Sequence, residues 1–248
     1  FKIKNNTDEN TWLSLSDMMT MLFVLFLILA IFIASHATKS LQKFTEVLDR
    51  FVTSENMLCK KLKKNLFIRF DKQDLQISCE PIRITFINDN YKFEHGKHEL
   101  PQEFKETLNK FFPIYLDIVS SWNFENKNGK KIDMSKFIDE VRIEGHTDSA
   151  GTSGPLDNNN YIYNMGLSQR RSKEVVQFAF TIKDLENKHQ WMRDKLTANG
   201  LSFSRRLNNN NELLDYNDSK QIENKKASRR IEIKLRTKAR ELITQLRD

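Results

Sequence analysis

The residue whose position most clearly suggests a chemical role is Asp17. It directly precedes Met18–Ala34, a stretch that is apolar at every position except Thr20. A carboxylate at the edge of a hydrocarbon layer is costly to ionise, so it tends to be neutral, paired or in contact with a wet path, and such a group can carry a proton. Thr20, one helical turn further on, would share its face and help to hydrate or hydrogen-bond it. The alternative is an interfacial helix cap in which Asp17 accepts backbone N–H bonds. Position alone favours neither interpretation.

A second group of chemically capable residues combines two glutamates and two histidines: Glu94, His95, His98 and Glu99. Such residues can bind a metal ion, and a bound metal ion could support enzymatic activity. Their spacing matches no zinc signature and their setting is typical of a loop, which favours a solvated turn. We therefore expect no enzymatic activity, no metal centre and no resident cofactor, only a transported ion. The lack of further polar groups near Asp17 favours H⁺ over Na⁺ as that ion.

Composition indicates an ordered protein, with 39% apolar and 29% charged residues, 18 phenylalanines and only seven glycines and four prolines in 248 residues. The excess of 40 Lys and Arg over 33 Asp and Glu gives a net charge of +7, which suits nucleic acid, a membrane surface or a cell-wall polymer. The basic residues form no nucleic-acid-binding motif, so no direct nucleic-acid partner is expected.

The apolar stretch predicts one transmembrane helix over residues 12–36, after a short segment 1–11. At 1.5 Å per residue the stretch spans about 25 Å, and its flanks extend it to the roughly 30 Å of a hydrocarbon core. Trp12 suits the interface. A cleaved signal peptide is the alternative, but no small-residue cleavage site follows cleanly. Lys39 and Lys43 follow the span, and the positive-inside rule alone would place the next domain in the cytoplasm.

Residues 37–65 predict a polar linker helix. Its apolar residues recur at spacings of three and four, with Glu55 breaking the pattern: Leu41, Phe44, Leu48, Phe51, Leu58 and Leu62. A short two-stranded coiled coil and a single amphipathic helix packed on the following domain explain this pattern equally well.

Residues 66–237 predict an α+β domain in which strands and helices alternate as βαβαβ, followed by a tail at 238–248. Strands are expected at Leu75–Ser78, Arg83–Ile87, Phe137–Glu144 and Arg230–Leu235. Helices are expected at Glu103–Ser120, interrupted at Pro113, and from Ser168 to Ile182. Composition indicates loops at Asn126–Lys131 and Asn208–Asn211.

Three separated motifs of this domain resemble the OmpA-like peptidoglycan-binding family: Ile143-Glu-Gly145-His-Thr147-Asp148, Asn164-Met-Gly-Leu167-Ser168-Gln-Arg-Arg171 and Asn224-Lys-Lys-Ala-Ser-Arg229-Arg230-Ile-Glu-Ile. The resemblance implies that Asp148 and Arg171 bind the diaminopimelate of the stem peptide, an acid for its ammonium and an arginine fork for its carboxylate. It also implies that Thr147, Asn164 and Leu167 shape the pocket.

The chain departs from the family pattern in two places. The loop Ser149–Tyr163 is longer than is typical, and Asn199-Gly200 matches the usual Gly-x-Gly turn weakly. If the longer loop closed the pocket, Asp148 and Arg171 would remain as a surface ion pair of little energetic consequence.

A span bearing Asp17 joined to such a domain resembles the B subunit of ion-driven stators such as flagellar MotB. The pattern Trp12-x-Ser14-x-x-Asp17-x-Met19-Thr20 followed by Val24-Leu-Phe-Leu27 is similar to the B subunit of the Zorya anti-phage defence system. The resemblance implies a homodimer inside a pentameric MotA-like A subunit (5:2), anchored to peptidoglycan and linked indirectly to cytosolic defence effectors. Alternatives are a flagellar stator subunit and a passive membrane-to-wall tether.

The same resemblance implies a single-pass inner-membrane protein with a cytoplasmic N-terminus and a periplasmic C-terminal domain, which overrides the local charge count. In that oxidising compartment Cys59 and Cys79 are expected to form a disulfide that joins the linker helix to the first strand. In the cytoplasm they would be two buried thiols.

Overall fold

The computed structural model describes residues 7–125, 129, 131–150, 157–215 and 222–238. The chain divides into two units, residues 1–51 and 52–248. One helix, α1 (Thr7–Leu66), contains both the expected membrane span and the expected linker helix without a break. Within the described residues it is also the one helix long and apolar enough to cross a membrane, with a mean hydropathy of 2.7 in its most apolar part.

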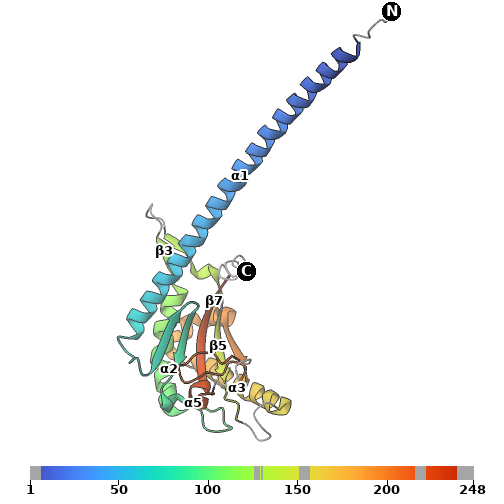
Figure 1. The fold of residues 1–248 in the computed structure, drawn as a ribbon. Coiled ribbons are helices and arrows are strands. Elements are labelled where there is room, and N and C mark those ends of the chain that lie inside the picture. Colours follow the sequence, from blue (N-terminus) through green and yellow to red (C-terminus); the bar gives the residue numbers. More distant parts are fainter. Residues whose placement is uncertain (1–6, 126–128, 130, 151–156, 216–221, 239–248) are drawn as a thin grey trace, which may run out of the picture. The chain divides into compact units, whose positions relative to one another are not determined.

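A five-stranded mixed sheet forms the centre of the second unit (Figure 1). Its strands lie in the order β1 (Leu75–Cys79), β2 (Ile82–Phe86), β7 (Arg230–Thr237), β5 (Ile138–His146) and β6 (Leu196–Gly200). Neighbouring strands are antiparallel except for the parallel pair β5 and β6, which a helical crossover connects. The predicted α+β class is confirmed, and the four predicted strands are present with ends shifted by one or two residues.

Helix α2 (Gln102–Ser120) packs an aromatic side against the sheet. The ring of Phe86, the last residue of β2, meets Phe104 and Phe111 edge-on at centroid distances of 5.0 and 5.2 Å. The predicted interruption at Pro113 is wrong, because the helix continues through it. Proline removes one backbone hydrogen bond, but aromatic residues buried on both sides of it hold the two turns against the core.

Helix α3 (Asn158–Ala179) lies directly on the backbone of β5 and β6. A Cβ atom on Gly145 would lie 2.3 Å from the carbonyl oxygen of Ser168, and one on Gly200 would lie 2.4 Å from the amide nitrogen of Gln169. No side chain fits at such distances, so these two glycines permit the contact.

The start of α3 differs from the expectation. The helix begins at Asn158 rather than at Ser168, so the three consecutive asparagines form its first turn. The side-chain amide of Asn164 donates to the backbone carbonyl and side-chain oxygen of Asn160 one turn earlier, at 3.0 and 2.8 Å, which satisfies polar groups inside the helix. The predicted long loop 149–163 is therefore shorter than expected at its C-terminal end, and its positions 151–156 lie outside the described residues.

The sheet face opposite these helices carries charged side chains. Phe86, Ile231 and Gly145 are register partners on the helix side, so the neighbouring partners Thr85, Glu232 and Glu144 lie on the other side. The segment after β6 covers part of this face, where Nη1 of Arg230 donates to the carbonyl of Arg205 at 3.1 Å. As a result Glu144 and Glu232 are buried despite their charge.

The last turns of α1 belong to the second unit and pack within it through a stripe of buried residues: Ser54, Glu55, Leu58, Cys59, Leu62 and Leu66. The carboxylate of Glu55 accepts a hydrogen bond from Oγ1 of Thr237 at 2.8 Å, at the end of β7. The expected disulfide between Cys59 and Cys79 is present and fastens the helix to β1. This segment therefore behaves as an amphipathic helix packed on the domain, whereas Leu41 is exposed.

The remaining elements are short: β3 (Asn123–Glu125) and β4 (Lys131–Asp133) form a two-stranded sheet, and α4 (His189–Lys195) and α5 (Lys225–Ser228) precede β6 and β7. Most of the loop predicted at 126–131 lies outside the described residues, as does most of the tail at 238–248.

Candidate functional site

A pocket of about 390 Å³ brings together all five residues that the OmpA-like resemblance assigned to peptidoglycan: Thr147, Asp148, Asn164, Leu167 and Arg171. The first two directly follow β5 and the other three lie on α3. The segment before α2 contributes a further wall, and the other lining residues come from the loop after β5, from α3 and from the position before β7: Lys92, Phe93, His95, Gly96, Ala150, Tyr163 and Arg229. The close approach of α3 to β5 places the end of the strand and the side of the helix around one space.

Asp148 is the acidic group of this pocket. Its Oδ2 accepts a hydrogen bond from Nη1 of Arg229 at 2.6 Å, and its Oδ1 accepts one from the backbone N–H of Ala150 at 3.2 Å. Arg229 directly precedes β7, and its side chain is 42% exposed. The guanidinium that the pocket presents beside the acid is therefore that of Arg229.

Arg171 lines the pocket, and its guanidinium is bonded to backbone carbonyls of the facing segment. Its Nε donates to the carbonyl of Lys97 at 2.9 Å and its Nη2 to the carbonyl of Glu94 at 3.1 Å. The guanidinium carbon lies 4.9 Å from the ring centroid of Phe93. Burial, with the nearby charge of Arg229, lowers the pKa of Arg171 to about 10. Arg171 thus holds the 94–97 segment against α3 and is bonded to backbone rather than to Asp148.

The segment that carries His95 and His98 is consequently a wall of the pocket, held in place by Arg171. His95 is exposed and faces the space between the two walls, and Glu94 pairs with Lys97. The residue pattern favoured a solvated turn for this stretch, and its place beside Asp148 was not predicted.

Thr147 supplies the third polar group of the pocket. Its backbone N–H donates to the carbonyl of Ser202 at 2.9 Å, which fixes the chain after β5. Its buried Oγ1 has no hydrogen-bond partner within the described part of the chain. A buried hydroxyl with no partner is costly, so this oxygen is suited to bond a ligand or a water molecule.

This arrangement can recognise a zwitterion. An incoming ammonium group would bond to the carboxylate of Asp148, and an incoming carboxylate would bond to the exposed guanidinium of Arg229. Arg229 was not predicted as a site residue, although it lies in the third motif. The signal available in the sequence was its position directly before a strand that alternates in polarity, because such a residue lies at the sheet edge where β5 also ends.

A larger hollow of about 550 Å³ adjoins this pocket, and Lys92 and Arg229 line both. Several side-chain amides line its remaining surface: Gln73, Gln76, Asn88, Asn90, Asn211 and Asn224. Amides suit hydroxyl and amide groups of a ligand. The combined surface is larger than one amino acid requires.

In the first unit, Asp17 lies on α1 and is exposed in the isolated chain, as are the apolar residues that follow it. The hydroxyl of Thr20 donates to the backbone carbonyls of Ser16 and Asp17 at 3.0 and 2.9 Å. Its proton is therefore directed to the backbone rather than to the carboxylate of Asp17. Such an uncovered apolar surface requires lipid or another subunit around it.

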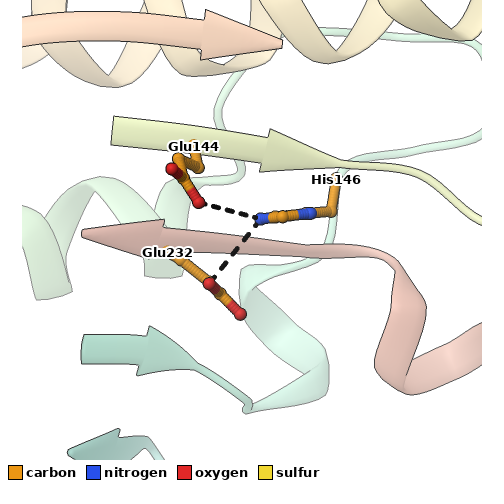
Figure 2. A group of neighbouring side chains, drawn as sticks. All are labelled: Glu144, His146 and Glu232. Atoms are coloured by element: carbon orange, nitrogen blue, oxygen red, sulfur yellow. Dashed lines mark ion pairs between the residues drawn. The ribbon is translucent and has the colours of Figure 1, made fainter. Parts of the chain in front are cut away.

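Among the described residues, one group of side chains has the types and proximity to hold a metal ion: Glu144, His146 and Glu232 (Figure 2). Burial, reinforced by Arg230, lowers the pKa of His146 to about 3, so the imidazole is neutral. Burial raises the pKa of Glu144. Burial alone would also raise the pKa of Glu232, but the charges of Arg230 and Arg83 and the hydrogen bond from Arg230 outweigh it and lower that pKa. Sequence reasoning did not identify this group.

No family profile matches the chain. The chain is 28% identical over 221 residues to the Zorya protein ZorB of Escherichia coli strain Crooks, covering 88% of each sequence. It is 27% identical over 241 residues to the Zorya protein ZorB of Escherichia coli O139:H28, covering 94% of this chain and 83% of that one. In three dimensions it is similar to a MotB-like protein from Desulfovibrio vulgaris, with a TM-score of 0.51, 14% identity and coverage of 77% and 99%.

Proposed function

We propose that this chain, a homologue of Zorya protein ZorB whose fold is that of a MotB-like protein, is the wall-anchored B subunit of a stator-type motor that serves anti-phage defence. In this role it is a non-enzymatic subunit that works with a MotA-like A subunit. Two copies would lie inside a ring of five A subunits, with the N-terminus in the cytoplasm and the globular unit in the periplasm.

The observation that carries the anchoring role is the pocket between β5 and α3. A buried carboxylate, an exposed guanidinium and an unpartnered hydroxyl converge there from Asp148, Arg229 and Thr147. A diaminopimelate side chain carries an ammonium and a carboxylate on one carbon, so it would exchange the Asp148–Arg229 pair for two pairs of its own. Arg171 would act as a positioning residue that holds the opposite wall.

The motor role rests on Asp17 at the mouth of the apolar stretch. Inside a ring of A subunits this carboxylate would alternately accept and release a proton. Each unit charge that crosses the membrane releases about 2.3 kcal/mol per 100 mV, which is the energy available for rotating the surrounding ring. The disulfide Cys59–Cys79 supports the periplasmic placement of the second unit, because such bonds persist in oxidising compartments.

The anchoring role is tested with the full chain in detergent, sedimented with purified peptidoglycan sacculi. We expect Asp148→Asn and Arg229→Gln each to reduce the sedimented fraction at least tenfold, because each removes one charge of the zwitterion clamp. The matched control is Asp184→Asn, an exposed acid on the 3₁₀ turn after α3, which should sediment like the native chain. Native-level sedimentation of Asp148→Asn would refute the clamp.

The motor role is tested separately by Asp17→Asn, which keeps shape and polarity but cannot carry a proton. We expect the variant to assemble with its A subunit and to lose anti-phage protection. Asp49→Asn, an exposed acid further along α1, is the matched control and should protect cells fully. Full protection by Asp17→Asn would leave the passive membrane-to-wall tether as the better description.

A further inference from the structure

Two buried carboxylates face each other across the centre of the sheet. Glu144 of β5 and Glu232 of β7 are direct register partners, and each is only 4% exposed. Like charges directly opposite one another in adjacent strands destabilise a sheet, and burial increases the cost of each charge. Arg230 and Arg142, which lie next to Glu232 and Glu144, offset part of this cost from outside the pair.

The imidazole of His146 is directed at this pair. Figure 2 shows its ring pointing between the two carboxylates, with Nε2 3.7 Å from Oε2 of Glu144 and 3.7 Å from Oε2 of Glu232. These distances are too long for hydrogen bonds. The side chain is 2% exposed, and within the described residues neither ring nitrogen makes a hydrogen bond. A buried imidazole nitrogen without a partner, aimed between two carboxylates, is suited to bond a further group placed there.

The separations suit a metal ion better than direct contact. Zinc bonds of about 2.0–2.2 Å to nitrogen and oxygen place tetrahedral ligand atoms roughly 3.4 Å apart. The imidazole–carboxylate separations of 3.7 Å are close to that value, and all three ligand atoms lie within 4.8 Å of one another. Small side-chain rotations would bring all three into coordination range.

The arginines of this face leave the inward oxygens available. Nε of Arg230 bonds to Oε1 of Glu232 at 2.6 Å, and Nη1 of Arg142 lies 3.8 Å from Oε1 of Glu144, so each of these arginines faces the oxygen that points away from His146. Arg83 is the exception, with Nη1 3.7 Å from Oε2 of Glu232. Its side chain is 39% exposed and makes no hydrogen bond there at that distance, so it can turn toward solvent.

We propose that Glu144, His146 and Glu232 form a structural site for one divalent transition-metal ion, with Zn²⁺ as the fitting ion. One neutral imidazole and two carboxylates are ligands that zinc accepts, and a water molecule would complete four-coordination. The bound ion would neutralise the facing carboxylates and bond Nε2 of His146. Outer hydrogen bonds from arginine to a ligating carboxylate are typical of such sites.

The site would join the two strands that carry the wall-binding pair. His146 ends β5 directly before Thr147 and Asp148, and Glu232 is the third residue of β7, which follows Arg229. A metal bridge between β5 and β7 would hold Asp148 and Arg229 at a fixed separation. The proposal concerns metal content and therefore stands or falls independently of wall binding.

The test measures metal in the full chain, purified in detergent with a histidine-free affinity tag and without chelator. The chain is loaded with one equivalent of ZnSO₄ and then dialysed against metal-free buffer. Elemental analysis should then find about one Zn²⁺ per chain. His146→Gln and Glu232→Gln should each retain less than about one tenth of that amount. The matched control is the double variant His95→Gln/His98→Gln. It removes two histidines that lie outside the proposed site, and it should retain Zn²⁺ fully. Co²⁺ should give visible absorption bands in the native chain and not in His146→Gln.

Three results would overturn the proposal. The first is native chain without bound Zn²⁺ or Co²⁺ after this loading. The second is retention of the metal by His146→Gln, and the third is loss of the metal in His95→Gln/His98→Gln, which would assign binding to the exposed histidines. Absence of metal from the native chain would refute the proposal whether or not the variants fold.

Discussion

Opening the Cys59–Cys79 disulfide gives the sharpest measure of what holds the linker helix on the domain. The two cysteines are 20 residues apart in sequence, and Cys59 is completely buried beneath β1. In the chain-entropy description, closing a loop of that length restricts the unfolded chain by about 3 kcal/mol. Reduction should therefore lower the free energy of unfolding of the second unit by about 3 kcal/mol. The buried thiols that result behave as small apolar groups and add no large polar penalty.

The assay is urea unfolding of the full chain in detergent, followed by tryptophan fluorescence, in which the buried Trp122 reports on the second unit. A urea slope of about 2 kcal/mol per molar converts 3 kcal/mol into a midpoint lower by roughly 1.5 M. The control is Cys59→Ala/Cys79→Ala, whose midpoint should match the reduced chain and should not respond to reductant. Oxidised and reduced midpoints that agree within about 0.3 M would refute the reasoning and show that packing alone holds the helix.

Four further substitutions test other parts of the second unit by the same urea midpoint. Gly145→Ala should cost about 1–3 kcal/mol because its Cβ meets the backbone of α3 at 2.3 Å, whereas Gly166→Ala, open to a flexible side chain, should gain about 1 kcal/mol in helix propensity. Thr237→Val should cost about 1–3 kcal/mol by removing the buried hydrogen bond to Glu55. Although burial opposes it, neighbouring donors lower the pKa of Glu140 below its usual 4.5. Glu140→Gln should therefore lower the free energy of unfolding by its full amount above pH 4.5. This difference from the native chain should shrink as the pH falls below 4.5.

The sequence predicted what local pattern encodes. Period-two polarity located β7, and the run of apolar residues located the most apolar part of α1. It failed where distant residues decide the outcome. The helix through Pro113 persists because buried aromatic rings on both sides hold it, and no local rule contains that packing.

The candidate site was partly predictable for a similar reason. Asp148 could be identified because its motif resembles that of the OmpA-like family. Its partner could not, because Arg171 and Arg229 are both arginines in recognised motifs and only the fold decides which one reaches the acid. The pairing of Glu144 with Glu232 depends on strand register, which neither segment determines alone.

The antiparallel pairing of β5 with β7 determines how a pulling force would pass through the domain. Asp148 and Arg229 lie at one end of this strand pair, and Thr237, bonded to Glu55 of α1, lies at the other. Tension between wall and membrane would therefore run along the strands. The backbone hydrogen bonds between β5 and β7 would then resist it together rather than breaking one after another. In the proposed anchoring role, the domain would therefore be strongest in the direction in which its attachment is loaded.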